Sequence, residues 1–204
     1  MLSLGALTLV VLASDPAAEV GWEVAKKMDG LTVYARDRKG SSVREMRAVG
    51  VIDAPPEKVW KALRAYDRYA LDMPYTEEAR VIAREDGDRI TWLYTVINAP
   101  MVDRRDYVIR LVDESKWKDG KGYLRVTWKP ANDKAPPLPE NIVRVQVNEG
   151  YWHLEPVEGG KTKATYYVYT DPGGSLPRWV ANRANSTAVP DVFEHVRKAA
   201  LRKQ

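Results

Sequence analysis

Histidine and cysteine, which often perform nucleophilic or metal-dependent catalysis, are scarce in this sequence. It holds two histidines, His153 and His195, and no cysteine. The histidines fall on a predicted strand and in the last predicted helix, without the spacing of a metal-binding motif. The sequence also lacks the Gly-x-Ser-x-Gly turn of a hydrolase and a phosphate-binding glycine loop. These absences argue against hydrolysis, thiolate chemistry, disulfides and structural zinc, and favour a protein that binds a ligand without transforming it.

The composition fits one globular domain of 204 residues, with 45% apolar and 29% charged residues. A chain of this length can bury a core and still leave an internal cavity. The formal net charge is +4, and basic residues are interspersed with acidic ones. Because no basic and aromatic binding motif stands out, we expect no nucleic-acid partner. The mild positive charge is compatible with an anionic membrane surface, but a solvated surface accounts for it better.

Tryptophan and tyrosine dominate the aromatic residues, with 7 Trp and 11 Tyr against 1 Phe. These side chains combine an apolar body with a polar tip, which suits the wall of a ligand cavity. Those on predicted strands are Trp92, Tyr94, Tyr107, Trp128, Tyr151, Trp152, Tyr167 and Tyr169. Alternation places Trp92 with Tyr94 on one face, and Tyr167 with Tyr169 on one face. The sequence leaves open whether such residues line a cavity or pack a core.

An apolar run from Leu2 to Ala13 begins the chain. It is short for a bilayer span but has the length of a signal-peptide core, and a small-x-small cleavage pattern ends at Ala18. We therefore expect residues 1–18 to be a signal peptide or N-terminal extension, followed by a binding domain over 19–204. A buried first helix and a membrane anchor are the alternatives. A cleaved signal would place the protein in the periplasm or outside the cell; otherwise it is cytoplasmic.

Hydrophobic periodicity predicts an α+β order of elements. We expect a short helix over 19–28 and a helix that begins at Pro55-Pro56. Strands are expected over 31–38, 43–53, 78–84, 89–97, 105–112, 123–128, 142–154 and 164–170. The breaks between the later strands have hairpin lengths, which indicates an antiparallel meander. A last helix begins near Pro177, and Pro190 should kink or split it. One curved antiparallel sheet wrapped around this helix satisfies the order.

Three stretches of the sequence resemble the START domain, a lipid-transfer family with the helix-grip fold. They are Pro-Met-Val-Asp-Arg-Arg-Asp-Tyr-Val over 100–108, Asp-Pro-Gly-Gly-Ser-Leu-Pro-Arg-Trp-Val-Ala-Asn over 171–182, and the set Arg36, Glu45, Gly50, Pro55 and Val59. The resemblance covers about Val20 to Lys203. It implies a curved antiparallel sheet that encloses a hydrophobic cavity with the C-terminal helix.

The resemblance also implies a function. START domains hold one lipid, such as a sterol or phospholipid, in a tunnel between sheet and helix, without a cofactor, a metal or catalysis. We expect a monomer that contacts membranes transiently. The alternatives are an enzyme like the polyketide cyclases of the wider superfamily, and a lipid-sensing partner protein.

By the same resemblance, Arg105 pairs with Glu78 inside the cavity; a position at the sheet rim is the alternative. Arg68 and Asp72 loosely match phosphate contacts of a phosphatidylcholine carrier, although Leu71 replaces that family's tryptophan; an exposed pair at a helix end is the favoured alternative. In the C-terminal helix we expect ligand contacts from Trp179, Val180, Arg183 and Thr187. Trp117, flanked by lysines in a hairpin loop, is a candidate for a membrane-contacting gate.

Overall fold

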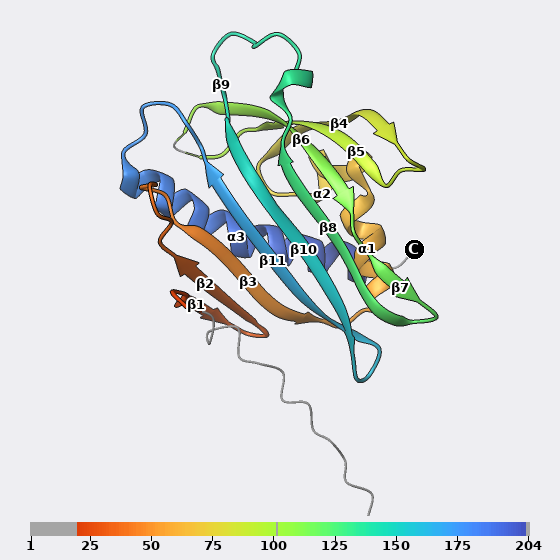
Figure 1. Cartoon of the computed structure of the whole chain (residues 1–204). Coiled ribbons are helices and arrows are strands. Elements are labelled where there is room, and N and C mark those ends of the chain that lie inside the picture. The colour runs from red at the N-terminus through yellow and green to blue at the C-terminus, as the bar shows by residue number, and fades with distance from the viewer. Residues whose placement is uncertain (1–19, 101, 203–204) are drawn as a thin grey trace, which may run out of the picture.

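The body of the protein is one curved sheet, seen in the computed structural model that describes residues 20–100 and 102–202 (Figure 1). The predicted signal segment lies outside these residues. The strands are β1 (Glu23–Met28), β2 (Leu31–Arg36), β3 (Glu45–Ile52), β4 (Thr76–Glu85), β5 (Ile90–Ile97), β6 (Arg104–Asp113), β7 (Lys116–Lys118), β8 (Lys121–Pro130), β9 (Ile142–Arg144), β10 (Val147–Val157) and β11 (Lys161–Asp171). Their order is β1-β2-β3-β11-β10-β8-β6-β5-β4, with β7 beside β8 and β9 beside β6.

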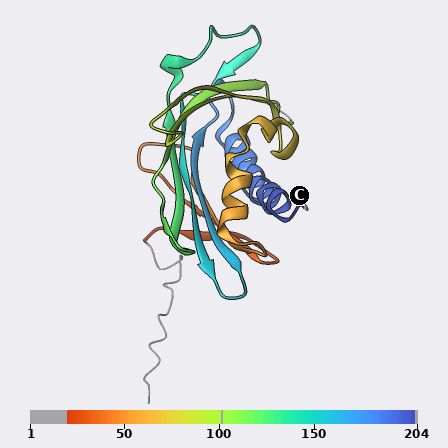
Figure 2. The same ribbon diagram turned by 90° about the vertical axis from the view of Figure 1, so that its right-hand side faces the viewer.

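The helices cover the concave face of this sheet, which we call the inner face (Figure 2). They are α1 (Pro56–Arg64), α2 (Tyr69–Asp72) and α3 (Arg178–Leu201), with the short 3-10 turns η2 (Tyr66–Arg68) and η3 (Asn132–Lys134). The C-terminal half of α3 packs on the sheet, where Phe193 and Val196 are fully buried. The Phe193 ring lies 5.6 Å from that of Trp152 on β10. This half of the helix is therefore fixed in the hydrophobic core.

The predicted helix over 19–28 is wrong, because its last six residues form β1. Met28 pairs with Leu31 and Lys27 with Thr32 across the turn at Asp29-Gly30. All six residues of β1 are exposed at the edge of the sheet. Pairing with β2 therefore overrides a weak helical pattern, as is common where a segment buries little apolar surface.

Two further details differ from the sequence-based expectation. The segment 142–154 is two strands: β9 runs parallel to β6, pairing Arg105 with Val143, before β10 begins. The sheet is therefore not purely antiparallel. Pro190 does not split α3, which runs unbroken from Arg178 to Leu201.

Within the described ranges, no helix combines the length and the apolar character that crossing a bilayer would require.

Candidate functional site

A cavity lies between the inner face and α3. Its larger end has a volume of about 270 Å³ and a smaller end has about 140 Å³. Both ends are lined by Pro74, Ile97, Tyr107, Asn148, Tyr166 and Val192. Because they share these walls, we describe them as the mouth and the deep end of one cavity.

Strand register decides which side chains face this cavity. In the β5–β6 pair, Ile97 lies opposite Arg105 and Thr95 opposite Tyr107. These four residues line the cavity. Since side chains alternate along a strand, Asp106 between them points to the outer face.

Of the charged residues that line the mouth, Arg105 is the most deeply buried, with 5% of its surface exposed. Its Nε donates to the carbonyl oxygen of Pro172 at 3.0 Å, and its Nη1 donates to that of Asp103. Burial lowers the pKa of Arg105, while the charge of the Asp103 carboxylate opposes that shift. Among the described residues no carboxylate forms an ion pair with this guanidinium.

The structure does not bring Glu78 to Arg105. A register shift between Thr76 and Glu78 places Glu78 opposite Val96, which in turn lies opposite Asp106 on the outer face. Glu78 is exposed there, and its carboxylate accepts from Nε of Arg80 at 2.9 Å. The predicted pair is therefore wrong, because one extra residue in β4 turns the side chain to the opposite face.

Polar groups in the middle of the cavity form a small network. Asn148 on β10 accepts hydrogen bonds through Oδ1 from Nε1 of Trp128 at 3.0 Å and from Oγ1 of Thr170 at 3.4 Å. Burial raises the pKa of Tyr107 to about 12, although hydrogen bonds with Thr95 and Asn148 act in the opposite direction. Burial also raises the pKa of Tyr166 above the ordinary value for tyrosine. Both tyrosines are therefore neutral hydroxyl groups at physiological pH.

The deep end is mostly apolar, with walls from α1, the central strands and the C-terminal half of α3. Its other lining residues include Leu63, Leu93, Ile109, Leu111, Val126, Trp128, Trp152 and Val196. No residue with a charged side chain lines it among the residues that the structure describes. This end therefore suits the hydrocarbon part of a ligand.

Three of the four residues expected from α3 line the mouth: Val180, Arg183 and Thr187. Their spacing places them on one side of the helix, together with Ala184 and Ala188. Trp179 does not join them. It points to solvent with 68% of its surface exposed.

The predicted strand aromatics divide between the two faces of the sheet. Tyr107 and Trp128 line the cavity, as does Trp152. Trp92 and Tyr94 share one face as expected, but it is the outer face, where Ala131 and Ile142 cover them. Their burial is therefore ordinary core packing beneath the segment that precedes β9.

Tyr151, Tyr167 and Tyr169 are also outside the cavity lining. Tyr151 and Tyr167 stack at 5.2 Å between ring centroids on the outer face. The Tyr169 hydroxyl donates to Oγ of Ser41 at 2.8 Å. Alternation predicted that Tyr167 and Tyr169 share a face, but only the tertiary arrangement shows that this face does not line the cavity.

Arg68 and Asp72 form an ion pair at 3.0 Å, but they do not line the cavity. Asp72 also binds Arg202 at 2.8 Å, just beyond the end of α3. The Arg202 guanidinium, and secondarily that of Arg68, lowers the pKa of Asp72. The Asp72–Arg202 pair therefore fastens the end of α3 to α2. Neither Arg68 nor Asp72 contacts the space open to a ligand.

Trp117 is likewise remote from the mouth. It lies on β7, half-buried, and packs against the main core. Two other loops border the mouth instead. The first contributes Ala99, Pro100 and Val102 to its lining, and the second contributes Pro172 and Leu176. The sequence-based prediction placed the gate in a different hairpin, the one that contains Trp117.

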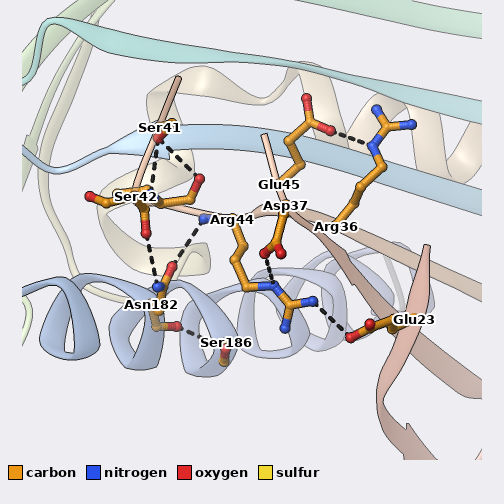
Figure 3. Close-up of polar contacts among 10 residues, drawn as sticks. Glu23, Arg36, Asp37, Ser41, Ser42, Arg44, Glu45, Asn182 and Ser186 are labelled. Carbon is orange, nitrogen blue, oxygen red and sulfur yellow. Dashed lines mark hydrogen bonds and ion pairs between the residues drawn. The ribbon is translucent and has the colours of Figure 1, made fainter. Parts of the chain in front are cut away.

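A polar clasp holds the N-terminal half of α3 to the β2–β3 hairpin (Figure 3). Asn182 accepts from the backbone N–H of Arg44 at 3.0 Å and donates to the carbonyl of Ser42 at 3.2 Å. Arg44 is positioned by ion pairs with Asp37 at 3.0 Å and Glu23 at 2.9 Å. Sequence analysis missed this clasp, because it joins residues that are far apart in the chain.

Comparison with known families agrees with this geometry. A family model described as START domain matches residues 6–204. The chain belongs to the START domain family. Both the family and the helix-grip fold predicted from sequence are thereby confirmed.

Relatives of this START domain include lipid-transfer proteins. The Pseudomonas aeruginosa protein PA1579 is 31% identical, over 96% of this chain and 98% of that protein. Phosphatidylcholine transfer protein from Rattus norvegicus is 24% identical, over 87% of this chain and 83% of that protein. START domain-containing protein 10 from Homo sapiens is 26% identical, over 93% of this chain but only 64% of the human protein. At the level of the family, lipid binding and transfer are thus confirmed.

Solved structures show the same architecture. The STAR-related lipid transfer protein from Xanthomonas axonopodis superposes with a TM-score of 0.79 at 28% identity, over 89% of this chain and 99% of that one. The Zhui aromatase/cyclase from Streptomyces reaches a TM-score of 0.52 at 17% identity, over 78% of this chain and 91% of that one. The second likeness shows a shared fold alone.

Proposed function

We propose that this START domain binds one hydrophobic ligand in the cavity between the inner face and α3, and carries it without chemical conversion. The observation that supports this most directly is the cavity itself, with an apolar deep end and a mouth that contains Arg105. The mouth alone, at about 270 Å³, approaches the lower limit of typical ligand cavities, about 300 Å³. The ligand class, a sterol, phospholipid or related lipid, is part of the proposal.

The lining chemistry favours binding over catalysis. Among its described residues, the lining contains no histidine, aspartate, glutamate or lysine. Its tyrosines include Tyr107 and Tyr166, whose raised pKa values make them poor bases. Such hydroxyl groups can orient a ligand by hydrogen bonds, but they do not supply a general base near neutral pH.

The N-terminal half of α3 is the part of the wall that we propose to open. One side of this half, from Val180 to Val189, lines the mouth, whereas Phe193 and Val196 beyond Pro190 are fixed in the core. Side-chain hydrogen bonds from Asn182 and Asn185 hold this half, the latter to the carbonyl of Thr170 at 3.0 Å. Opening therefore requires few contacts to break, with Pro190 at the boundary.

Native mass spectrometry after incubation with a lipid extract tests ligand binding. We expect one bound lipid per chain in the wild type. Ala188→Trp should abolish this binding, because Ala188 lines the mouth and an indole would fill it. Ser186→Trp is the matched control, since Ser186 is exposed on the same helix. Absence of any bound lipid, or equal binding by both variants, would refute the proposal.

Transfer between liposomes separates a carrier from a sensor. A carrier accelerates the exchange of a labelled lipid between donor and acceptor vesicles, whereas a sensor binds without acceleration. We expect acceleration by a monomer that contacts each membrane transiently, and light scattering during gel filtration measures the oligomeric state. Turnover of a polyketide-like substrate would instead favour an enzyme.

We also propose that the protein is exported from the cytoplasm. The apolar run from Leu2 to Ala13 has signal-peptide character, which would place the carrier in the periplasm or outside the cell. N-terminal sequencing of the protein from its native host checks this, with cleavage near Ala18 as the expected result.

A further inference from the structure

We infer that the ligand of this cavity is an amphiphile with an anionic polar end, a carboxylate or a phosphate, that binds the guanidinium of Arg105. This inference rests on the proposed function and specifies its ligand class. It begins from the charges of the cavity wall. The charged residues of the described lining are Arg105 and Arg183, and both are basic.

The environment of Arg105 leaves its charge without compensation. The side chain is 5% exposed, and its hydrogen-bond partners are the neutral carbonyls of Pro172 and Asp103. The Asp103 carboxylate contributes only its electrostatic field, since that residue is exposed and forms no ion pair with Arg105. A buried charge without a paired countercharge is costly. An anion in the cavity would remove that cost.

Buried acids elsewhere in the fold are paired. Asp106, fully buried, receives two hydrogen bonds from Arg144, from Nε at 3.0 Å and from Nη2 at 2.7 Å. Glu45, 7% exposed, accepts from Nε of Arg36 at 2.6 Å. The same chain thus supplies a guanidinium for each of these buried carboxylates, yet supplies no carboxylate for Arg105. The missing partner is therefore expected from the ligand.

The two ends of the cavity define how such a ligand lies. The mouth contains Arg105 in its wall and Arg183 at its exposed rim, whereas the deep end has no charged residue among those described. An anionic head beside Arg105 would direct the hydrocarbon part toward Leu93, Ile109 and Trp152. A neutral hydroxyl could accept a hydrogen bond from Arg105 but would leave its charge uncompensated. An ionised head would accept hydrogen bonds from Arg105 and also compensate its charge, because guanidinium binds carboxylate or phosphate through paired, charge-assisted hydrogen bonds.

Matched ligands that differ only at the head test the inference. Hexadecanoic acid is compared with hexadecanol at about pH 8, where the carboxylic acid is ionised. Phosphatidic acid is compared with diacylglycerol of the same chains, which separates a phosphate head from a carboxylate head. We expect at least one acid to bind about tenfold or more tightly than its neutral partner, the ratio typical of a charge-assisted hydrogen bond.

Variants at the two arginines locate the effect. Arg105→Gln should abolish the preference for the acid, because the amide can still donate a hydrogen bond but carries no charge. Arg105→Lys should retain part of the preference, because it keeps the charge but loses the paired geometry. Arg183→Gln, at the exposed rim, should reduce the preference by less than Arg105→Gln. Thermal unfolding and circular dichroism of each variant check the fold.

The outcomes distinguish this inference from the function on which it rests. Equal affinity of the wild type for both acids and their neutral partners would overturn the inference while leaving lipid binding intact. So would an unchanged preference in Arg105→Gln. If none of these four compounds binds, the inference fails, and the lipid-extract experiment decides whether the proposed function fails with it. The wild-type comparison needs no variant, so it decides the question even if Arg105→Gln does not fold.

Discussion

Asn182 on α3 accepts a hydrogen bond from the backbone N–H of Arg44 at 3.0 Å, across 138 positions of sequence. Its amide nitrogen donates to the carbonyl of Ser42 at 3.2 Å (Figure 3). One side chain thus uses both its acceptor and its donor on the backbone of the β2–β3 hairpin. This relationship fixes the N-terminal half of α3 over the mouth of the cavity.

Asn182→Ala should weaken the closed position of α3. Two hydrogen bonds of about 0.5–1.5 kcal/mol each are lost, so we expect lipid release to become about fivefold faster or more. Stopped-flow release of a fluorescent lipid measures the rate. Hydrogen exchange of residues 178–189 should rise in parallel, while exchange of residues 191–201 should not.

The matched control is Ser186→Ala. The Ser186 hydroxyl donates to the carbonyl of Asn182 at 2.8 Å, a bond within α3 that does not reach the hairpin. If this variant accelerates release as much as Asn182→Ala does, a general loosening of the helix explains the effect and the clasp has no special role.

The buried pair of Asp106 and Arg144 should be important for stability. Asp106 is fully buried, and its carboxylate accepts both hydrogen bonds from Arg144 while the Tyr94 hydroxyl donates to it at 3.2 Å. Arg144→Met leaves this carboxylate buried without its countercharge. We expect a loss of about 3–5 kcal/mol in the free energy of unfolding, measured by urea denaturation.

An exposed pair on the same face provides the comparison. Glu78→Gln removes an ion pair with Arg80 in which about half of each side chain is exposed, and we expect a loss of at most about 1 kcal/mol. Similar losses in the two variants would show that the Asp106–Arg144 pair contributes no more than a surface contact.

Stability should fall at alkaline pH because of the cavity tyrosines. Burial raises the pKa of Tyr107 to about 12, above its ordinary value of about 10. Above about pH 10 the native state keeps a proton that the unfolded chain releases, so folding is disfavoured as pH rises. The contribution is complete below about pH 10 and is lost as the pH approaches about 12.

Tyr107→Phe removes the hydroxyl group whose ionisation produces this pH dependence. The slope of unfolding free energy against pH between about 10 and 12 should become less negative, by up to about 1.4 kcal/mol per pH unit. A weaker dependence remains, because burial raises the pKa values of Tyr166 and Tyr69 as well. An unchanged slope would mean that the Tyr107 hydroxyl is not protected from solvent base.

Most of the element order could be predicted from sequence, because strands and helices leave local periodic patterns. The strand expected over 89–97 is β5 (Ile90–Ile97), and the last helix begins one residue after Pro177. The prediction was wrong at 19–28, since an exposed edge strand buries no apolar face and so leaves no clear period. It was also wrong for Glu78, where a single extra residue in β4 changes the face of the sheet.

The sequence by itself determined the α+β class, the START family and the importance of a few positions on β6 and α3, because these depend on residue types along short stretches. Only the tertiary structure decided which side of the sheet is the inside. Tyr107 and Asp106 are neighbours in sequence, yet one lines the cavity and the other is paired with Arg144 on the outer face. A strand's period is two, so a shift of one residue exchanges its faces, and that register is set by pairing with distant strands.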